Sequence, residues 1–146
     1  MRSNNSGVPE APDFDRARRL ARMPLATSKD VVRMRQKVSE EMKALGQSAT
    51  RITRFATAVS EIARNTVVHG GGGEGGIWHD PKSAYLLVEC RDRGAGIEDL
   101  DRAMEDGFST AGSLGRGLGG AQRLSAYFEV RSSGTDGTRV RLGARL

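Results

Sequence analysis

Residues 61–69 read Glu-Ile-Ala-Arg-Asn-Thr-Val-Val-His, and they place a carboxylate, an amide and an imidazole at Glu61, Asn65 and His69. The spacing is i, i+4 and i+8, so the three side chains share one face of a helix. Two glycine-containing segments follow, Asp92-Arg93-Gly94-Ala95-Gly96-Ile97 and Gly115-Arg116-Gly117-Leu118-Gly119-Gly120. We interpret the three segments, in this order, as the parts of a nucleotide pocket whose helix face holds a metal and phosphate groups.

The length and composition predict one globular domain. A chain of 146 residues suffices for a single core and is too short for two. We expect a flexible, arginine-rich leader over residues 1–24 and one domain over residues 25–146. No apolar run reaches the length of a membrane span, and residues 1–12 lack the apolar stretch of a secretory signal. We therefore expect a cytoplasmic protein without a membrane partner. The single cysteine, Cys90, lies in an apolar run and is expected to be a buried thiol.

The charge pattern argues against a nucleic-acid partner. The net charge is +5, but 19 of the 23 basic residues are arginines scattered along the chain. No aromatic residues alternate with the densest group, as a surface for stacking nucleic-acid bases would require; that group is Arg16, Arg18, Arg19 and Arg22. A solvated basic face is the simplest interpretation, and the alternatives are an acidic protein partner or a loose attraction to nucleic acid.

Two amphipathic helices are predicted in the first half of the chain. Residues 29–45 follow a candidate N-cap at Ser28 and carry apolar residues at helical spacing: Val31, Met34, Val38, Met42 and Leu45. Residues 48–68 carry a second stripe: Ile52, Phe55, Val59, Ile62 and Thr66. A short helix is also expected around residues 15–21, ended by Pro24.

The rest of the chain predicts a sheet. Residues 70–76 are rich in glycine and are expected to form a flexible turn. Strands are expected over residues 77–79, 85–91, 128–132 and 138–142, with helices over 97–106 and 121–127. The dipeptide Asp136-Gly137 indicates a hairpin between the last two strands. The fold class is therefore α+β, a two-layer sandwich with helices on one face of a mixed, mostly antiparallel sheet.

The residues of the helix face suit metal-assisted phosphate chemistry. Mg²⁺ prefers oxygen ligands and takes only one or two from a protein when phosphates supply others, so Asn65 can be its protein ligand. Glu61, one turn earlier, can accept the proton of an attacking hydroxyl. Taken alone, the two residues are better explained as a surface glutamate and a helix-capping asparagine. The downstream motifs favour the functional interpretation.

Those downstream motifs suit a base and a polyphosphate. Asp92 directly follows a predicted buried strand, where its carboxylate can accept a hydrogen bond from an exocyclic amine such as that of adenine. Gly94 and Gly96 remove side chains where the backbone turns closely. The later glycines precede a helix, whose free amides favour phosphates. They come too late in the chain for a dinucleotide-binding βαβ unit, which argues against a Rossmann domain.

The three segments resemble the N, G1 and G2 boxes of the GHKL (Bergerat-type) ATPase superfamily, over roughly residues 25–146. Within it, residues 99–127, which include Glu105-Asp106-Gly107-Phe108-Ser109-Thr110, are similar to the RsbT-type bacterial switch serine/threonine kinases. The resemblance implies ATP and Mg²⁺ as cofactors, with Glu61 as general base, Asn65 as metal ligand and Asp92 on the adenine amino group. It implies a short lid over residues 107–113 and further nucleotide contacts from His69, Gly94, Gly96, Ile97, Ser109, Thr110, Gly115, Gly117, Leu118, Gly119 and Thr138. For His69, a structural role at the helix end fits equally well.

The resemblance implies a protein kinase that phosphorylates a serine or threonine of a STAS-domain antagonist and then changes partners. A PP2C-type phosphatase or a sigma factor would be the next partner. The alternative is a nucleotide-gated binding module, anti-sigma or phosphatase-activating, with little or no catalysis. Histidine-kinase autophosphorylation does not fit, because the only histidines are His69, inside the predicted pocket, and His79, in a predicted strand. ATP-driven mechanical work does not fit, because the chain is too short for a second domain to move.

Overall fold

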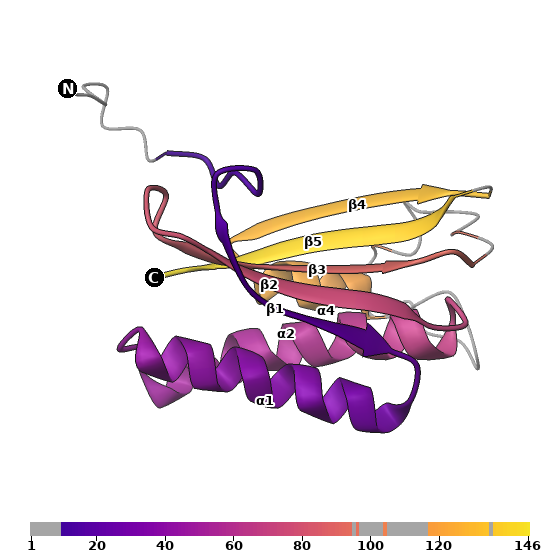
Figure 1. Cartoon of the computed structure of the whole chain (residues 1–146), viewed down its shortest axis with the longest axis horizontal. Coiled ribbons are helices and arrows are strands. Elements are labelled where there is room, and N and C mark those ends of the chain that lie inside the picture. Colours follow the sequence, from indigo (N-terminus) through magenta and orange to yellow (C-terminus); the bar gives the residue numbers. More distant parts are fainter. Residues whose placement is uncertain (1–9, 95, 97–103, 105–116, 135) are drawn as a thin grey trace.

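The computed structural model describes residues 10–94, 96, 104, 117–134 and 136–146. The elements follow the order β1 (Arg18–Leu25), α1 (Ser28–Ala44), α2 (Ala49–Val68), β2 (Gly73–Asp80), β3 (Tyr85–Asp92), α4 (Leu118–Arg123), β4 (Tyr127–Ser133) and β5 (Gly137–Arg145). The strands form one sheet in the order β1-β2-β3-β5-β4, and each pair of neighbours is antiparallel. The helices lie together on one side of this sheet (Figure 1). The predicted two-layer α+β sandwich is confirmed.

Both long helices bury most of the stripes that their sequences predicted, while Leu45, which follows α1, and Ile52 are partly buried. The N-cap of α1 is Thr27 and not the predicted Ser28, which is the first residue of the helix. Asp30 Oδ2 accepts the N–H groups of Ala26 and Thr27 at 2.8 and 3.1 Å. Ser48 precedes α2, and its Oγ accepts the N–H of Arg51 at 3.3 Å. The buried apolar residues of the two helices are Val31, Met34, Val38 and Met42 from α1, and Phe55, Ala56, Ala58, Val59, Ile62 and Ala63 from α2.

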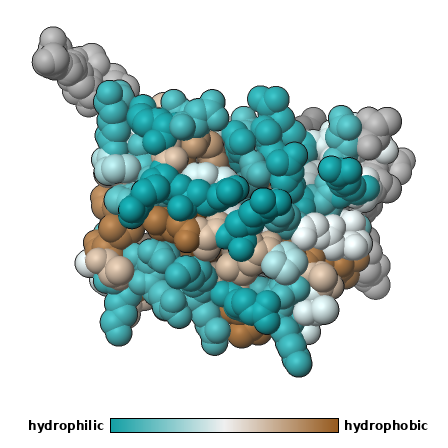
Figure 2. All heavy atoms as spheres, viewed as in Figure 1, coloured by the Kyte–Doolittle hydropathy of each residue, from teal (hydrophilic) through white to brown (hydrophobic). Residues whose placement is uncertain are grey.

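The core lies between the two layers. Strand residues that alternate along β2, β3 and β5 point at the helices and complete it: Ile77, Leu86, Val88, Cys90, Val140, Leu142 and Ala144. Figure 2 shows hydrophilic residues over most of one side of the molecule, with hydrophobic ones exposed mainly in a band between the layers. Cys90 is buried, as expected. Among the described helices, none has both the length and the apolar character needed to cross a membrane.

The helix expected around residues 15–21 is wrong, because Arg18–Leu25 is the edge strand β1. Ala21, Met23 and Leu25 face the helices and alternate with outward-facing residues, which is a strand period. Pro24 is tolerated there because an edge strand has one side free of ladder bonds. The sheet therefore begins before Leu25.

The flexible turn expected over residues 70–76 is wrong for Gly73 to Gly76, which begin β2. These glycines permit close packing. A Cβ on Gly73 would lie 1.9 Å from the Arg91 carbonyl oxygen, and one on Gly76 would lie 2.5 Å from the Trp78 ring. The glycines are thus required by the neighbouring strand and by an aromatic ring lying along β2.

The last part of the chain also differs in its boundaries. α4 begins at Leu118 and ends at Arg123, earlier than the predicted helix over residues 121–127. The hairpin between β4 and β5 is confirmed, with Gly137 at φ +81° opposite Ser133. The helix expected over residues 97–106 lies almost wholly outside the described residues.

Candidate nucleotide site

A narrow hollow lies where α2, α4, β3 and β5 meet, at the end of the sheet where β3 finishes. Its apolar walls and its few polar groups come from Ile62, Asn65, Thr66, Cys90, Asp92, Leu118, Thr138 and Val140. Mostly apolar walls with a few fixed polar groups are typical of sites for flat, uncharged rings. Asp92 and Thr138 also border a wider, open cavity of about 1140 Å³.

Asp92 is held in one orientation at the end of β3. Its Oδ1 accepts the backbone N–H of Gly94 at 2.8 Å and that of Thr138 at 3.2 Å. The hydroxyl of Thr138 is in turn bonded to the Ser132 hydroxyl at 2.9 Å. Because Oδ1 is engaged by two backbone donors, the carboxylate presents a defined acceptor at the hollow.

Three glycines surround Asp92 so closely that none of them can carry a side chain. A Cβ on Gly70 would lie 2.2 Å from Asp92 Oδ2, and one on Gly137 would lie 2.3 Å from the Asp92 carbonyl oxygen. A Cβ on Gly94 would lie 2.9 Å from the carbonyl oxygen of Gly70. The end of α2, the segment after β3 and the start of β5 therefore converge on this one carboxylate.

The side chain of Glu61 extends from α2 to Gly117, directly before the start of α4. Its Oε2 accepts a bond from Arg64 Nη1, one turn later, at 2.7 Å. A Cβ on Gly117 would lie 2.6 Å from Oε1, and Gly117 has φ +67°. Gly117 thus combines a left-handed backbone with direct apposition to Glu61, and only glycine meets both requirements at low cost. The predicted helix-face carboxylate and the predicted glycine-rich segment meet at this point.

Asn65 lies on the same face of α2 as Glu61, and His69 is the C-cap residue directly after the helix; both residues are half-buried. The carbonyl of Asn65 ends the helix by accepting the N–H groups of His69 and Gly70 at 2.9 and 3.0 Å. Asn65 also lines the hollow. An amide oxygen is a hard donor that suits Mg²⁺, and one such protein ligand is sufficient when phosphates and waters complete the shell. The donor present therefore fits the implied metal.

The structure brings most of the predicted residues to one end of the sandwich. Leu118 and Gly119 are buried at the start of α4. Gly96 has φ +81°, and a Cβ there would lie 2.6 Å from the Ser133 carbonyl oxygen, so it packs against the end of β4. Ile97, Ser109, Thr110 and Gly115 lie outside the described residues, and their predicted contacts stay predictions.

Sequence reasoning missed Gly70, Gly137, Thr66 and Cys90 as parts of this site. Gly70 follows His69 directly, and Gly137 belongs to the hairpin dipeptide, so both were visible as turn signals and not as neighbours of Asp92. Cys90 lines the hollow, and burial raises its pKa to about 12. It therefore contributes an inert, apolar wall.

The sequence was also compared with known proteins. Residues 25–143 match the family described as the histidine kinase-like ATPase domain. The chain is 39% identical over 118 residues to the serine/threonine-protein kinase RsbT of Bacillus subtilis, covering 80% of this chain and 89% of that protein. It is 28% identical over 123 residues to the anti-sigma F factor of Lysinibacillus sphaericus, covering 80% and 84%. It is 32% identical over 104 residues to the anti-sigma F factor of a Thermoanaerobacter species, covering 67% and 73%.

Proposed function

The chain belongs to the histidine kinase-like ATPase domain family, and on this premise we propose that it is an ATP-dependent serine/threonine protein kinase of a bacterial partner-switching pathway. The observation that carries the proposal is the apposition of Glu61 to Gly117, because it places a carboxylate where the glycine-rich segment enters α4. The similarity to a relative named as a serine/threonine-protein kinase supports the same reaction.

The adenine ring would bind where the hollow, which itself encloses only about 10 Å³, meets the wider cavity at Asp92 and Thr138. Asp92 Oδ2 would accept the exocyclic amine, since Oδ1 is already engaged by Gly94 and Thr138. The apolar walls would exclude water from the ring faces. Asn65 would hold Mg²⁺, which when bound supplies positive charge to the phosphate oxygens. Binding energy from the base thereby orients the phosphates toward Glu61 and Gly117.

In the transfer step, Glu61 would accept the proton of a partner's serine or threonine hydroxyl. The hydroxyl oxygen then bonds to the γ-phosphorus while the bond from that phosphorus to the β,γ-bridging oxygen breaks, leaving ADP. Arg64 holds Oε2 at 2.7 Å, so it would keep the carboxylate directed with Oε1 toward Gly117. The products are ADP and a phosphorylated partner, with the proton on Glu61.

The substrate we propose is a STAS-domain antagonist, with a sigma factor or a PP2C-type phosphatase as the alternate partner. Phosphorylation adds about two negative charges to the substrate surface, which is sufficient to break a complex formed with the unmodified hydroxyl. The kinase would then be released to bind its next partner in the cytoplasm.

The first experiment is transfer of labelled γ-phosphate from Mg-ATP into the proteins of an extract of the source cells. We expect one small labelled protein with the wild type and none with Glu61→Ala. The matched control is Glu40→Ala, which removes a carboxylate of 71% exposure from α1, away from the hollow. Full labelling by Glu61→Ala would remove Glu61 from the mechanism.

The second experiment tests the base site separately from catalysis. Asp92→Asn keeps the size of the side chain, but its amide oxygen would be drawn to the Gly94 and Thr138 donors, which turns its NH₂ group toward the adenine amine. We expect calorimetry to show at least about a hundredfold weaker ATP binding, as when a buried donor loses its acceptor. Tight binding by Asp92→Asn would refute the placement of the base.

The second candidate function is a nucleotide-gated binding module with little or no catalysis. Its support is the similarity to relatives named as anti-sigma F factors. It predicts that ATP binds, that no protein is labelled by the wild type, and that partner binding is equally strong in Glu61→Ala.

A further inference from the structure

The face of the sheet opposite the helices gathers arginines from four strands. Residues paired directly across strands project to the same side, and Ile77, Val88 and Leu142 point at the helices, so their chain neighbours point away. The outward arginines form what we call the arginine face: Arg19 and Arg22 of β1, Arg91 of β3, Arg131 of β4, and Arg139 and Arg141 of β5.

Carboxylates on this face are too few to neutralise the guanidinium groups. Glu89 is bonded to Arg141 at 2.7 Å and is 3.7 Å from Arg91. Glu129 is likewise shared, at 3.5 Å from Arg139 and 3.7 Å from Arg131. Glu74 is paired with Arg22 alone, at 2.7 Å. Asp15 is a further carboxylate that lines the hollow, and it forms no ion pair with another described residue. Among the described residues, Arg19 has no carboxylate within ion-pair distance.

In two of the ion pairs the carboxylate lies beneath the more exposed guanidinium. The side chain of Glu89 is 9% exposed, whereas that of Arg91 is 62% exposed. The side chain of Arg131 is 72% exposed, and that of its partner Glu129 is 33% exposed. Glu74, at 41%, and Asp15 are themselves exposed, so the outermost charge of this face is mainly, and not wholly, positive.

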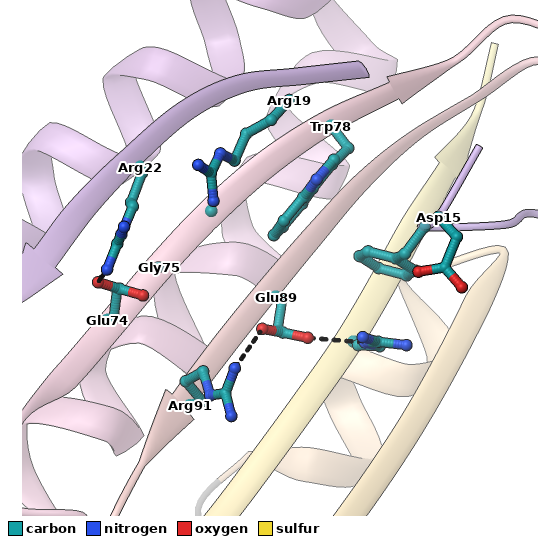
Figure 3. Close-up of a pocket in the computed structure, with 11 residues that line it drawn as sticks. Asp15, Arg19, Arg22, Glu74, Gly75, Trp78, Glu89 and Arg91 are labelled. Atoms are coloured by element: carbon teal, nitrogen blue, oxygen red, sulfur yellow. Dashed lines mark hydrogen bonds and ion pairs between the residues drawn. The ribbon is translucent and has the colours of Figure 1, made fainter. Parts of the chain in front are cut away.

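The arginine face contains a hollow of about 240 Å³ with an aromatic side (Figure 3). Gly75 and Gly76 form its floor, and the ring of Trp78 lies close over Gly76. Arg19 and Trp78 come from adjacent strands, and Glu89 is joined to Arg91 by an ion pair (Figure 3). Because Gly76 has no side chain, the Trp78 ring can lie flat on this face, whereas a side chain on Gly75 would point to the core side, toward Leu25 and Met34. Arginines and carboxylates both line the hollow.

The N-terminal segment supplies one wall of the hollow and is fixed to the sheet. Asp80 is fully buried and accepts bonds from Arg16 Nε at 2.9 Å and from the backbone N–H of Asp13 at 3.1 Å. Between these anchors, the Phe14 ring packs edge-on against Trp78, with centroids 5.2 Å apart. The guanidinium of Arg141 lies 4.2 Å from the centre of the Phe14 ring. The hollow is therefore a built feature of the fold.

We propose that this hollow and the arginine face dock an acidic segment of a partner protein. Glutamates interleaved with the arginines would repel a continuous phosphate backbone, while separate carboxylate side chains can pair with separate arginines, so a protein segment fits better than a nucleic acid. A second copy of this chain would bring one arginine face against another, which places like charges together.

The docking site is continuous with the nucleotide site. Arg22, Glu74 and Arg91 line the hollow and also line the wider cavity that reaches Asp92 and Thr138. A segment seated on the arginine face therefore leads along the sheet to the end where phosphate transfer is proposed. The identification of the docked protein as the phosphoacceptor rests on the proposed function, whereas docking itself does not.

The test uses Trp78, which is the single tryptophan of the chain. The full-length protein is titrated with an octaglutamate peptide while tryptophan emission is followed, without nucleotide. We expect a saturable change in emission for the wild type and for Glu61→Ala, and about tenfold weaker binding for the double variant Arg19→Gln, Arg91→Gln. The control double variant Lys29→Gln, Lys43→Gln removes the same charge from exposed positions of α1 and should bind within twofold of the wild type.

The other outcomes overturn the proposal. Equal weakening in the two double variants, or no emission change at all, would show that no specific site for acidic side chains exists. Binding of an octathymidylate as tight as that of octaglutamate would assign the face to nucleic acid. A dimer in sedimentation that dissociates in the arginine variant would assign it to a second copy. Thermal melts of all variants establish that each is folded. Asp92→Asn should lose ATP binding and still bind the peptide as the wild type does, which separates failure of the proposed nucleotide site from failure of the docking site.

Discussion

Gly70→Ala should weaken ATP binding through a steric effect on Asp92. Gly70 has an ordinary backbone conformation, so the added methyl group introduces no strain of its own. That Cβ would lie 2.2 Å from Asp92 Oδ2 and 2.3 Å from its Cγ, whereas ordinary contacts begin at 3.4 Å. The carboxylate must therefore retreat by more than about 1 Å, as an overpacked group does.

Moving the Asp92 carboxylate should cost binding free energy for ATP, which can be estimated from the hydrogen bonds that it loses. The bonds from the Gly94 and Thr138 N–H groups, at 2.8 and 3.2 Å, would stretch beyond hydrogen-bond length. Losing an ordered, charged acceptor is worth about 2 kcal/mol, which corresponds to roughly thirtyfold weaker ATP binding. Overpacking should lower the free energy of unfolding by about 1–3 kcal/mol.

Calorimetric titration with Mg-ATP measures the first effect and a urea melt the second. The control is Gly46→Ala, at the far end of the helix pair, where φ is +80° and no atom lies within 4 Å of an added Cβ. It should lower stability by about 1 kcal/mol and leave ATP binding unchanged. If Gly70→Ala binds ATP within threefold of the wild type while Asp92→Asn does not, the glycine contact is not what orients the carboxylate.

Three further predictions follow from the contacts described. Gly117→Ala should slow phosphate transfer at least about tenfold at saturating ATP. The added Cβ would lie 2.6 Å from Glu61 Oε1, so the carboxylate would have to move away. An unchanged turnover rate would argue against the contact between Gly117 and Glu61. The Arg16 guanidinium holds the pKa of the Asp80 carboxyl well below its usual 3.8, so Asp80 stabilises the fold above about pH 4 and loses this contribution as the pH falls. Asp80→Asn should therefore lower the free energy of unfolding at pH 7 by about 2 kcal/mol. Between pH 5 and pH 2 its free energy of unfolding should fall less steeply than that of the wild type. Parallel pH profiles for the two proteins would contradict this. Cys90, with its pKa raised to about 12 by burial, should react with a thiol reagent at pH 8 only after unfolding, and rapid labelling of the folded protein would contradict its burial.

The features that sequence reasoning predicted correctly depend on local periodicity. The apolar stripes of α1 and α2 follow the 3.6-residue repeat, which also places Glu61 and Asn65 on one face without reference to the rest of the chain. The hairpin at Gly137 follows from its own dipeptide. Each of these results from interactions within a few residues.

The features that were predicted incorrectly depend on partners far along the chain. β1 contains Pro24 and several arginines and has weak intrinsic strand character, so its conformation comes from pairing with β2 about fifty residues later. Gly73 and Gly76 resemble a loop by composition, but they are glycines because the Arg91 carbonyl and the Trp78 ring occupy the space of a side chain. No local pattern contains that information.

By itself, the sequence determined the two-layer class, the helix face with Glu61 and Asn65, and the strand-end position of Asp92, because each is encoded by spacing along one element. Only the tertiary structure brought Gly70 and Gly137 against Asp92 and set Gly117 against Glu61. It also collected arginines that are scattered along the chain onto one face. The physical reason is that the alternation within each strand is local, whereas the order of the strands in the sheet decides which alternating rows become neighbours.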